Sequence, residues 1–478
     1  SLRTGAVTGL ALLAIAASAA AYLATTQKQR AETEASTTQE TMDFMVSIFT
    51  LADPTEARAN QFTVREMLDR GAQDVQRQLR DRPAVRSSLM TAMGKAYTGL
   101  GLPAPAREVL AAALRDREKI AGAGARTTTE TRSALAAALY LDGQYEDAEK
   151  QFRTALASAR RLAPAGDAMV ASILNGLGDS LSQLGADAEA ESNYREALDI
   201  DQRLFGPESV ESAQTLQGLA STLYFAERYE DAEPLMLRSL AIRRKQLGPN
   251  HWKVADSLND LGALYYQTGR YDLAAQVWKE CLPISEKWAG KDHPEVASVA
   301  NNIGRSLLVA GKLDEAESYL SQTLEMRRRT KPAGHDDFIL PLNSLAMIDI
   351  ARRDYHGAEV KLDEALGIAE KQHHWMLDQV LTNLADVYAK SGRASQAEEL
   401  LARARTLLEK QYPRAAMPEE AWRYALQDAV LATTRAAQKQ YPEARKLLTD
   451  ALPIVRKRFG EGRYYTRDLE ERLARLPR

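Results

Sequence analysis

The sequence predicts an all-α fold: a right-handed α-solenoid of helix–turn–helix units with a 42-residue period, preceded by a transmembrane helix. Three observations lead to this prediction. Small residues recur at a fixed interval, helix-favouring alanine, leucine, glutamate and arginine are abundant, and a long uncharged stretch lies near the N-terminus. A chain of 478 residues is too long for one compact core, whereas in a repeat array each unit packs only on its neighbours.

The N-terminal residues 4–26 carry no charged side chain and are rich in alanine. At about 1.5 Å per residue, a helix of this length can cross a hydrocarbon layer of about 30 Å. We therefore expect a transmembrane helix at 4–26, a polar stalk at 27–42 and a juxtamembrane helical segment at 43–83. A cleaved signal peptide ending near the small residues 17–21 and an ordinary soluble helix are the alternatives.

An alanine marks the same point in nine consecutive repeats, and we call this set the alanine column. Its members are Ala106, Ala148, Ala190, Ala232, Ala274, Ala316, Ala358, Ala397 and Ala444. The first six intervals are 42 residues, followed by 39 and 47. A small residue also stands twelve positions before and seven positions after each member. Because two antiparallel helices approach closely only where the facing side chains are small, this pattern predicts stacked helix pairs over 84–458 and a capping helix at 459–478.

This small-residue pattern resembles that of the tetratricopeptide repeat (TPR), and its long period resembles the kinesin-light-chain subtype. That subtype has an inter-repeat loop of the form leucine, glycine, any residue, aspartate, histidine, proline. Here the loops read LGPNHWKVA at 247–255 and AGKDHPEVA at 289–297. The resemblance covers 84–458, about nine repeats. It implies a concave groove, lined by the first helix of each pair, that binds a protein or an extended peptide.

The residues that line such a groove follow from their positions in the repeat. They are Asn175, Gln217, Asn259, Asn301, Asn343, Tyr140, Tyr224, Tyr266 and Arg305. A side-chain amide both donates and accepts hydrogen bonds, so a column of amides can bind the backbone of an extended peptide without reading its sequence. The alternative is that these amides cap and bridge neighbouring helices.

No residue pattern in the chain indicates catalysis, a cofactor site or a metal site. Phosphate-binding loops, zinc-protease motifs and nucleophile elbows are absent from the sequence. His251, His293 and His335 lie 42 residues apart, one per repeat, which favours loop anchoring at helix starts over a shared metal site. Cys281 is the single cysteine, occupies a small-residue position and is expected to be buried.

Charge is nearly balanced along the chain, with 62 basic and 65 acidic residues, which gives no reason to expect nucleic acid as a partner. Two basic clusters, 243–245 and 327–329, stand near the ends of predicted second helices. We expect them to complement the helix dipole. Binding of an acidic partner is the alternative.

Residues 43–80 resemble the segment between the membrane span and the repeats of bacterial transmembrane serine/threonine protein kinases. The matching residues are Phe49, 52–54 and 63–71. The resemblance implies the extracytoplasmic sensor or docking region of such a kinase, single-pass in the bacterial inner membrane, with homodimerisation as one means of relaying a signal. The kinase domain, which uses ATP and magnesium, would then lie upstream of this chain. The alternatives are a stand-alone membrane-anchored assembly scaffold and the repeat region of a membrane-bound winged-helix transcriptional regulator.

Overall fold

A computed structural model describes residues 63–477, which contain 20 α-helices and no strand. The chain divides into two compact units, one ending at Ala226 and the other beginning at Glu227. The N-terminal unit contains α2 (Val64–Gln78), α3 (Pro83–Gly99), α4 (Pro103–Ala121), α5 (Arg126–Leu141), α6 (Tyr145–Leu162), α7 (Ala168–Gln183), α8 (Asp187–Phe205) and α9 (Val210–Phe225).

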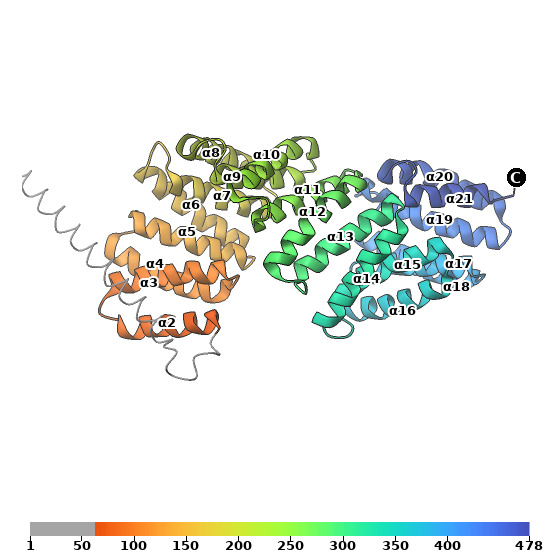
Figure 1. Cartoon of the computed structure of the whole chain (residues 1–478), viewed down its shortest axis with the longest axis horizontal. Helices are drawn as coiled ribbons and strands as arrows, with labels where there is room; N and C mark the ends of the chain where they lie inside the picture. The colour runs from red at the N-terminus through yellow and green to blue at the C-terminus, as the bar shows by residue number, and fades with distance from the viewer. Residues whose placement is uncertain (1–62, 478) are drawn as a thin grey trace, which may run out of the picture. The chain divides into compact units, whose positions relative to one another are not determined.

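The C-terminal unit contains α10 (Tyr229–Leu247), α11 (Trp252–Gln267), α12 (Tyr271–Ala289), α13 (Pro294–Ala310), α14 (Leu313–Thr330), α15 (Ile339–Arg352), α16 (Tyr355–Gln372), α17 (Leu377–Lys390), α18 (Ala394–Gln411), α19 (Ala421–Ala437), α20 (Tyr441–Phe459) and α21 (Tyr464–Ala474), with the 3₁₀ helices η2 (Asp336–Phe338) and η3 (Pro418–Glu420). From α3 to α20, odd-numbered helices are the first and even-numbered helices the second members of the repeats; we call them A and B helices. Within each unit, successive helices lie side by side (Figure 1).

The alanine column has one structural position throughout the solenoid. Every member is the fourth residue of a B helix, and every member is fully buried. This includes Ala397 and Ala444, where the spacing departs from 42 residues. The wider last interval contains a longer connection, residues 412–420, which holds η3. The prediction of repeated helix pairs is therefore confirmed for the described residues.

Glycines in the A helices allow large side chains of the B helices to fit. A Cβ atom added to Gly178 would lie 2.7 Å from the ring of Tyr194, and one added to Gly262 would lie 2.6 Å from the ring of Trp278. Both aromatic residues stand four positions after a member of the alanine column and are buried. The small-residue position thus sets how large the facing side chain can be, because protein interiors are close-packed.

Ion pairs link consecutive B helices at matching positions. In each pair an arginine twelve residues after one alanine-column member contacts a glutamate six residues after the next member. The pairs are Arg160–Glu196, Arg244–Glu280 and Arg328–Glu364. Because these side chains are largely exposed, each pair is expected to contribute only about 0–1 kcal/mol. They help to keep neighbouring repeats in register.

The prediction of a membrane-spanning helix is not supported by the structure. Among residues 63–477, no helix combines the length and the apolar character needed to cross a membrane. The segments predicted at 4–26 and 27–42 lie outside the described residues, so the fold described here is a helical solenoid without a spanning helix. The single-pass placement in the bacterial inner membrane, which depended on that helix, is withdrawn.

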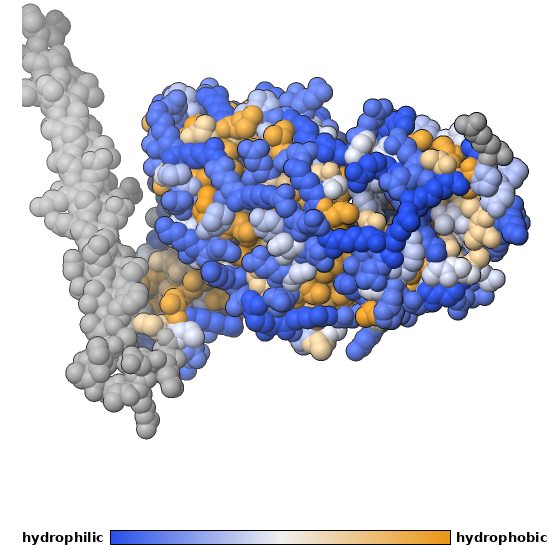
Figure 2. Space-filling model, turned by 45° about the vertical axis from the view of Figure 1, so that its right-hand side comes forward, coloured by the Kyte–Doolittle hydropathy of each residue, from blue (hydrophilic) through white to orange (hydrophobic). Residues whose placement is uncertain are grey.

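Figure 2 shows a mostly hydrophilic visible face with separate hydrophobic patches, because the helices bury their apolar sides against one another.

The last helix, α21, lies against the A helices of the C-terminal unit. The hydroxyl of Tyr464 donates a hydrogen bond to the backbone oxygen of Met347 in α15 at 3.1 Å. Arg472 donates to both carboxylate oxygens of Asp386 in α17, at 2.7 and 2.8 Å. It also donates to the hydroxyl of Thr433 in α19 at 2.7 Å. Since Met347, Asp386 and Thr433 each stand eleven residues before an alanine-column member, α21 contacts one position in three successive repeats.

In Figure 1, α21 lies beside α19 and α20. A hydrophobic cluster holds this end of the chain in place, and its members come from α12, α13, α19, α20 and α21. The buried members that meet there include Tyr271, Val309, Ala429, Phe459 and Leu469. The C-terminal helix is therefore part of the core of its unit.

Candidate functional site

The residues predicted to line a peptide groove all lie on A helices, and they divide between the two units. Tyr140, Asn175, Gln217 and Tyr224 belong to the N-terminal unit, and Asn259, Tyr266, Asn301, Arg305 and Asn343 belong to the C-terminal unit. We call the A-helix position eleven residues before the alanine column the inner position. Arg305 occupies it in α13, and the three partners of α21 occupy it in α15, α17 and α19.

Several of the predicted amides make contacts within the repeat stack. The side-chain nitrogen of Asn175 donates to the hydroxyl of Thr215 in the next A helix at 2.8 Å. Asn343 accepts a hydrogen bond from Asn383, also in the next A helix, at 2.8 Å. Asn259 accepts one from the indole nitrogen of Trp278 at 3.0 Å. These contacts support the bridging interpretation of the amides, and their role in binding a peptide stays a prediction.

The structure brings two of the predicted residues, Tyr266 and Arg305, into direct contact. The guanidinium of Arg305 donates to the Tyr266 hydroxyl at 3.2 Å and lies 5.2 Å from the centre of its ring. Tyr266 packs against the same hydrophobic cluster as Tyr465 of α21. This part of the predicted groove is thus already in contact with the chain's own C-terminal segment, which the sequence pattern did not indicate.

The contact between α21 and α17 is a buried charge network. Arg472 and Asp386 have side chains that are only 11% and 6% exposed. Burial tends to raise the pKa of Asp468, but the positive charges of Arg472 and Lys390 outweigh it and lower that pKa to about 2. The two carboxylates that contact Arg472, those of Asp386 and Asp468, are therefore paired with positive charge. A buried charge without such a partner would be strongly destabilising.

The A helices α3, α5 and α7 of the N-terminal unit line an open pocket with a volume of ≈ 450 Å³, on the face that carries the inner positions. Small and polar side chains form its wall. The lining residues are Lys95 and Thr98 of α3, Glu130, Ser133, Ala134 and Ala137 of α5, and Ala168, Met169 and Ser172 of α7. Lys95 and Ala137 occupy the inner position. The Lys95 ammonium makes no hydrogen bond or ion pair with residues 63–477.

Sequence comparison agrees with this architecture. The signature of the tetratricopeptide repeat matches residues 128–166, and a second signature of the same repeat matches 169–245, 220–287 and 253–329. Residues 128–329 therefore carry tetratricopeptide repeats. No curated protein matches the sequence.

Two solved structures share the helical fold. The apo form of RapI is 13% identical, with a TM-score of 0.62 over 78% of this chain and 98% of RapI. A signal transduction ATPase with numerous domains and a TPR sensor, from Pyrococcus horikoshii, is 16% identical, with a TM-score of 0.54 over 74% of this chain and 54% of that protein. At these identities the similarity concerns the fold alone.

The histidines of the TPR connections cap helices. The Nδ1 atoms of His251, His293 and His335 accept hydrogen bonds from the backbone N–H two residues later, at 3.1, 3.2 and 3.2 Å. Each satisfies one of the free N–H groups that begin a helix. The prediction that these histidines anchor loops at helix starts is confirmed.

Replacing His293 with alanine is expected to lower the free energy of unfolding by about 1 kcal/mol, because the cap of α13 is lost. Asparagine at the same position should keep most of the stability, since its side-chain oxygen also accepts from the helix start. Urea denaturation followed by circular dichroism measures both changes. His356→Ala, at an exposed position inside α16, is the matched control and should change little. Equal losses for His293→Ala and His293→Asn would contradict the capping role.

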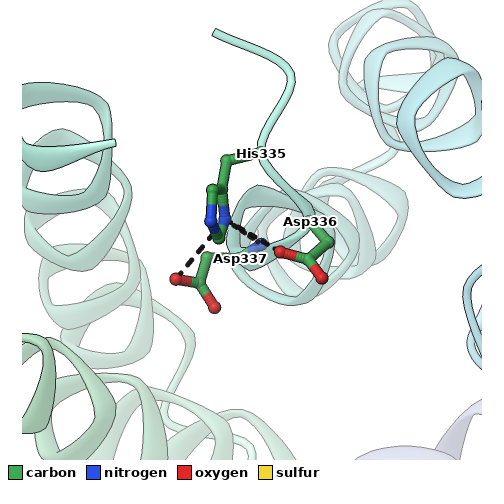
Figure 3. A group of neighbouring side chains, drawn as sticks. All are labelled: His335, Asp336 and Asp337. Atoms are coloured by element: carbon green, nitrogen blue, oxygen red, sulfur yellow. Dashed lines mark hydrogen bonds and ion pairs between the residues drawn. The ribbon is translucent and has the colours of Figure 1, made fainter. Parts of the chain in front are cut away.

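His335, Asp336 and Asp337 form a compact group at the start of η2, as Figure 3 shows. The Nδ1 atom of His335 lies 2.8 Å from a carboxylate oxygen of Asp336 and already accepts the N–H of Asp337. The geometry therefore matches the capping arrangement of the other TPR connections, and we assign no metal to it.

The first arginine of each basic cluster reaches into the next repeat. Arg243 is buried and donates to the hydroxyl of Ser257 at 2.7 Å and to the backbone oxygen of Lys253 at 3.1 Å. Arg327 is also buried and donates to the backbone oxygen of Asp337. Burial lowers the pKa of both guanidinium groups. These two side chains thus connect consecutive TPR units, a role that the pattern of basic residues alone did not reveal.

Cys281 is fully buried, as its position predicted, and its Sγ atom lies 3.3 Å from the backbone oxygen of Ala255. Burial raises the pKa of the thiol to about 11. A thiol of this kind is unreactive at neutral pH, because the thiolate is the nucleophile. The residue serves as a small side chain between the helices of its TPR unit.

Proposed function

We propose that this TPR scaffold binds an extended segment of a partner protein on the inner surface of its N-terminal unit. The observation that carries the proposal is the pocket formed by α3, α5 and α7. It crosses three consecutive repeats at the A-helix face that the resemblance associates with peptide binding. A segment lying across several repeats can make one set of contacts with each of them.

The chemistry of the pocket suits a peptide backbone with an acidic side chain. The small side chains of Ser133, Ala134 and Ala137 leave room for a backbone to approach the helices. Hydroxyl groups at Ser133 and Ser172 can donate to or accept from peptide groups. Lys95, which has no partner in the described part of the chain, offers a positive charge for a carboxylate.

The inner position differs between the two units, and this difference favours the N-terminal unit as the binding site. In the C-terminal unit this position contacts α21 in three successive repeats. In α3 and α5 the same position, occupied by Lys95 and Ala137, lines the open pocket. A ligand can therefore approach the N-terminal unit without first displacing α21.

The proposal can be tested with peptides selected from a displayed random library on the 478-residue chain. Peptides enriched by the unaltered chain are then titrated by fluorescence anisotropy. Ala137→Arg, which fills the pocket, is expected to weaken binding by at least about tenfold, or about 1.4 kcal/mol. Lys95→Glu should weaken the binding of peptides that carry acidic residues and affect neutral peptides less, because it replaces the one basic side chain of the wall with a second acidic one beside Glu130.

The matched control is Ala157→Arg, the same substitution at an exposed position of the B helix α6. It should leave the affinity unchanged. Equal affinity for the Ala137→Arg and Ala157→Arg variants would overturn the proposed site. So would a selection that enriches no peptide.

We also propose that this chain is attached to a serine/threonine kinase domain, as the resemblance of its N-terminal part implies. It is supported by the match at 63–71, where Thr63 and Glu66 begin α2 with a reciprocal pair of hydrogen bonds. Reading the coding sequence upstream of Ser1 tests it. A glycine-rich ATP-binding loop followed by a kinase catalytic loop supports the proposal, and with it the expected need for ATP and magnesium. A start codon directly upstream favours the stand-alone scaffold, and a winged-helix domain favours the transcriptional regulator. Homodimerisation also stays a prediction.

A further inference from the structure

A second pocket in the C-terminal unit lies where α21 meets the ends of α15 and α16. Its volume is ≈ 200 Å³, and most of its wall is polar. Four basic and two acidic residues line it, so its wall carries a net positive charge. They are Arg353, Lys390, Arg467, Arg475, Asp468 and Glu471.

Two of the four basic side chains have no partner among residues 63–477. Lys390 is 2.8 Å from a carboxylate oxygen of Asp386, and Arg475 is 2.9 Å from one of Glu471. The guanidinium groups of Arg353 and Arg467 make no hydrogen bond or ion pair with any residue in 63–477. The excess positive charge of the pocket therefore belongs to these two arginines, which offer ten N–H donors between them.

Arg353 also occupies a backbone position that disfavours it. The residue five positions before each alanine-column member has a positive φ, as the turn between A and B helices requires. Six of the nine repeats have glycine there, and the exceptions are Glu227, Arg353 and Lys439. A side chain in the left-handed region carries a steric cost that glycine avoids. Because Arg353 occupies this disfavoured position and lines the same pocket as Arg467, its side chain is a candidate for a role other than folding.

We propose that this pocket binds a small oxyanion with two negative charges, such as a phosphate group. Guanidinium groups bind phosphate through pairs of parallel hydrogen bonds, and two of them match the charge of a dianion. The ligand would contact Arg353 at the end of α15 and Arg467 in α21. The inference does not depend on the proposed peptide site, which lies in the other unit.

Such a ligand would hold α21 in place. Four of the lining residues, Tyr464, Arg467, Asp468 and Glu471, belong to α21, and Arg475 directly follows it, so the complete pocket forms only when this helix is docked. Because a ligand that binds one state stabilises that state, the anion would favour the arrangement in which α21 covers the inner positions of the C-terminal unit. Release of the anion would make these positions easier to expose.

The test is calorimetric titration of the 478-residue chain with inorganic phosphate and with sulfate, at constant ionic strength set by chloride. The unaltered chain is expected to bind both dianions. Arg353→Gly and Arg467→Gln should each weaken the binding by at least about tenfold, because each removes one charge-assisted contact. A parallel titration with glycerol 3-phosphate distinguishes a free phosphate ion from the phosphate group of a small organic molecule. Tighter binding of the ester indicates a phosphorylated small molecule, and weaker binding indicates the free ion.

Thermal unfolding provides the second readout. Arg353→Gly should raise the midpoint without phosphate, since it removes a disfavoured backbone conformation, and it should lose the phosphate-dependent rise of the unaltered chain. Lys439→Gly is the matched control: it changes an equivalent position, with φ of 64° in both residues, away from the pocket. It should raise the midpoint and keep the phosphate-dependent rise. Absence of dianion binding by the unaltered chain would overturn the inference. So would binding by Arg353→Gly or Arg467→Gln that is as tight as binding by the unaltered chain.

Discussion

Replacing Arg472 with alanine is expected to release α21 from the inner positions of the C-terminal unit. The substitution removes the guanidinium that pairs with both Asp386 and Asp468 and leaves Lys390 as the one basic side chain near these two carboxylates among the described residues. Removing one partner of a buried ion pair typically costs about 3–5 kcal/mol, because the remaining charge stays desolvated. The freed helix would also lose the hydrogen bonds of Arg472 to Thr433 and to the backbone of Ala429.

Hydrogen exchange measured by mass spectrometry checks this result. Backbone amides in α21 should exchange much faster in the Arg472→Ala variant, while amides in α3 to α8 keep their protection. The matched control is Arg456→Ala, which removes a pair with Glu470 of α21 at 2.8 Å whose side chains are 42% and 41% exposed. Removing this exposed pair should lower the free energy of unfolding by only about 0–1 kcal/mol. Similar exchange of α21 in the two variants would contradict a buried anchor at Arg472.

Gly262→Ala is expected to destabilise the C-terminal unit, although alanine is the better helix former. The added methyl group would lie 2.6 Å from the ring of Trp278, which is held in place by its hydrogen bond to Asn259. Overpacking of this kind costs about 1–3 kcal/mol, more than the gain of about 1 kcal/mol in helix propensity. The tryptophan cannot move away easily, because it is buried among the helices of its repeat.

The control for this prediction is Gly367→Ala in α16, where an added Cβ meets no other atom within 4 Å. That substitution should stabilise the chain by about 0.5–1 kcal/mol, since only the backbone preference changes. Urea denaturation of both variants separates the two effects by sign. A gain in stability for Gly262→Ala would show that the close approach of α11 and α12 does not limit this position.

The repeat architecture could be predicted from the sequence because its cause is local. Small residues at a fixed spacing allow helices to pair, and the pairing partners of each helix are its neighbours along the chain. The histidine caps could be predicted for the same reason, since His251 and the N–H that it contacts are two residues apart. Cys281 was placed correctly because its column is small in every repeat.

Contacts between distant repeats could not be predicted in this way. Arg463 pairs with Asp272 across 191 residues, and Arg472 pairs with Asp386 across 86. No periodic signal marks such partners, because α21 stands outside the repeat and its partners lie far from it along the chain. The role of the predicted amides was also open, since the same side chain can bridge two helices or bind a ligand.

By itself, the sequence determined that this chain pairs and stacks its helices, where each pair begins, and which side chains lie between the two helices of a repeat. These properties depend on steric fit between segments that are close along the chain. Only the tertiary structure decided which inner positions stay open and which are covered by α21. It also decided that Arg353 and Arg467 share a pocket, because packing within the C-terminal unit brings the last helix to the ends of helices that lie more than a hundred residues earlier in the chain.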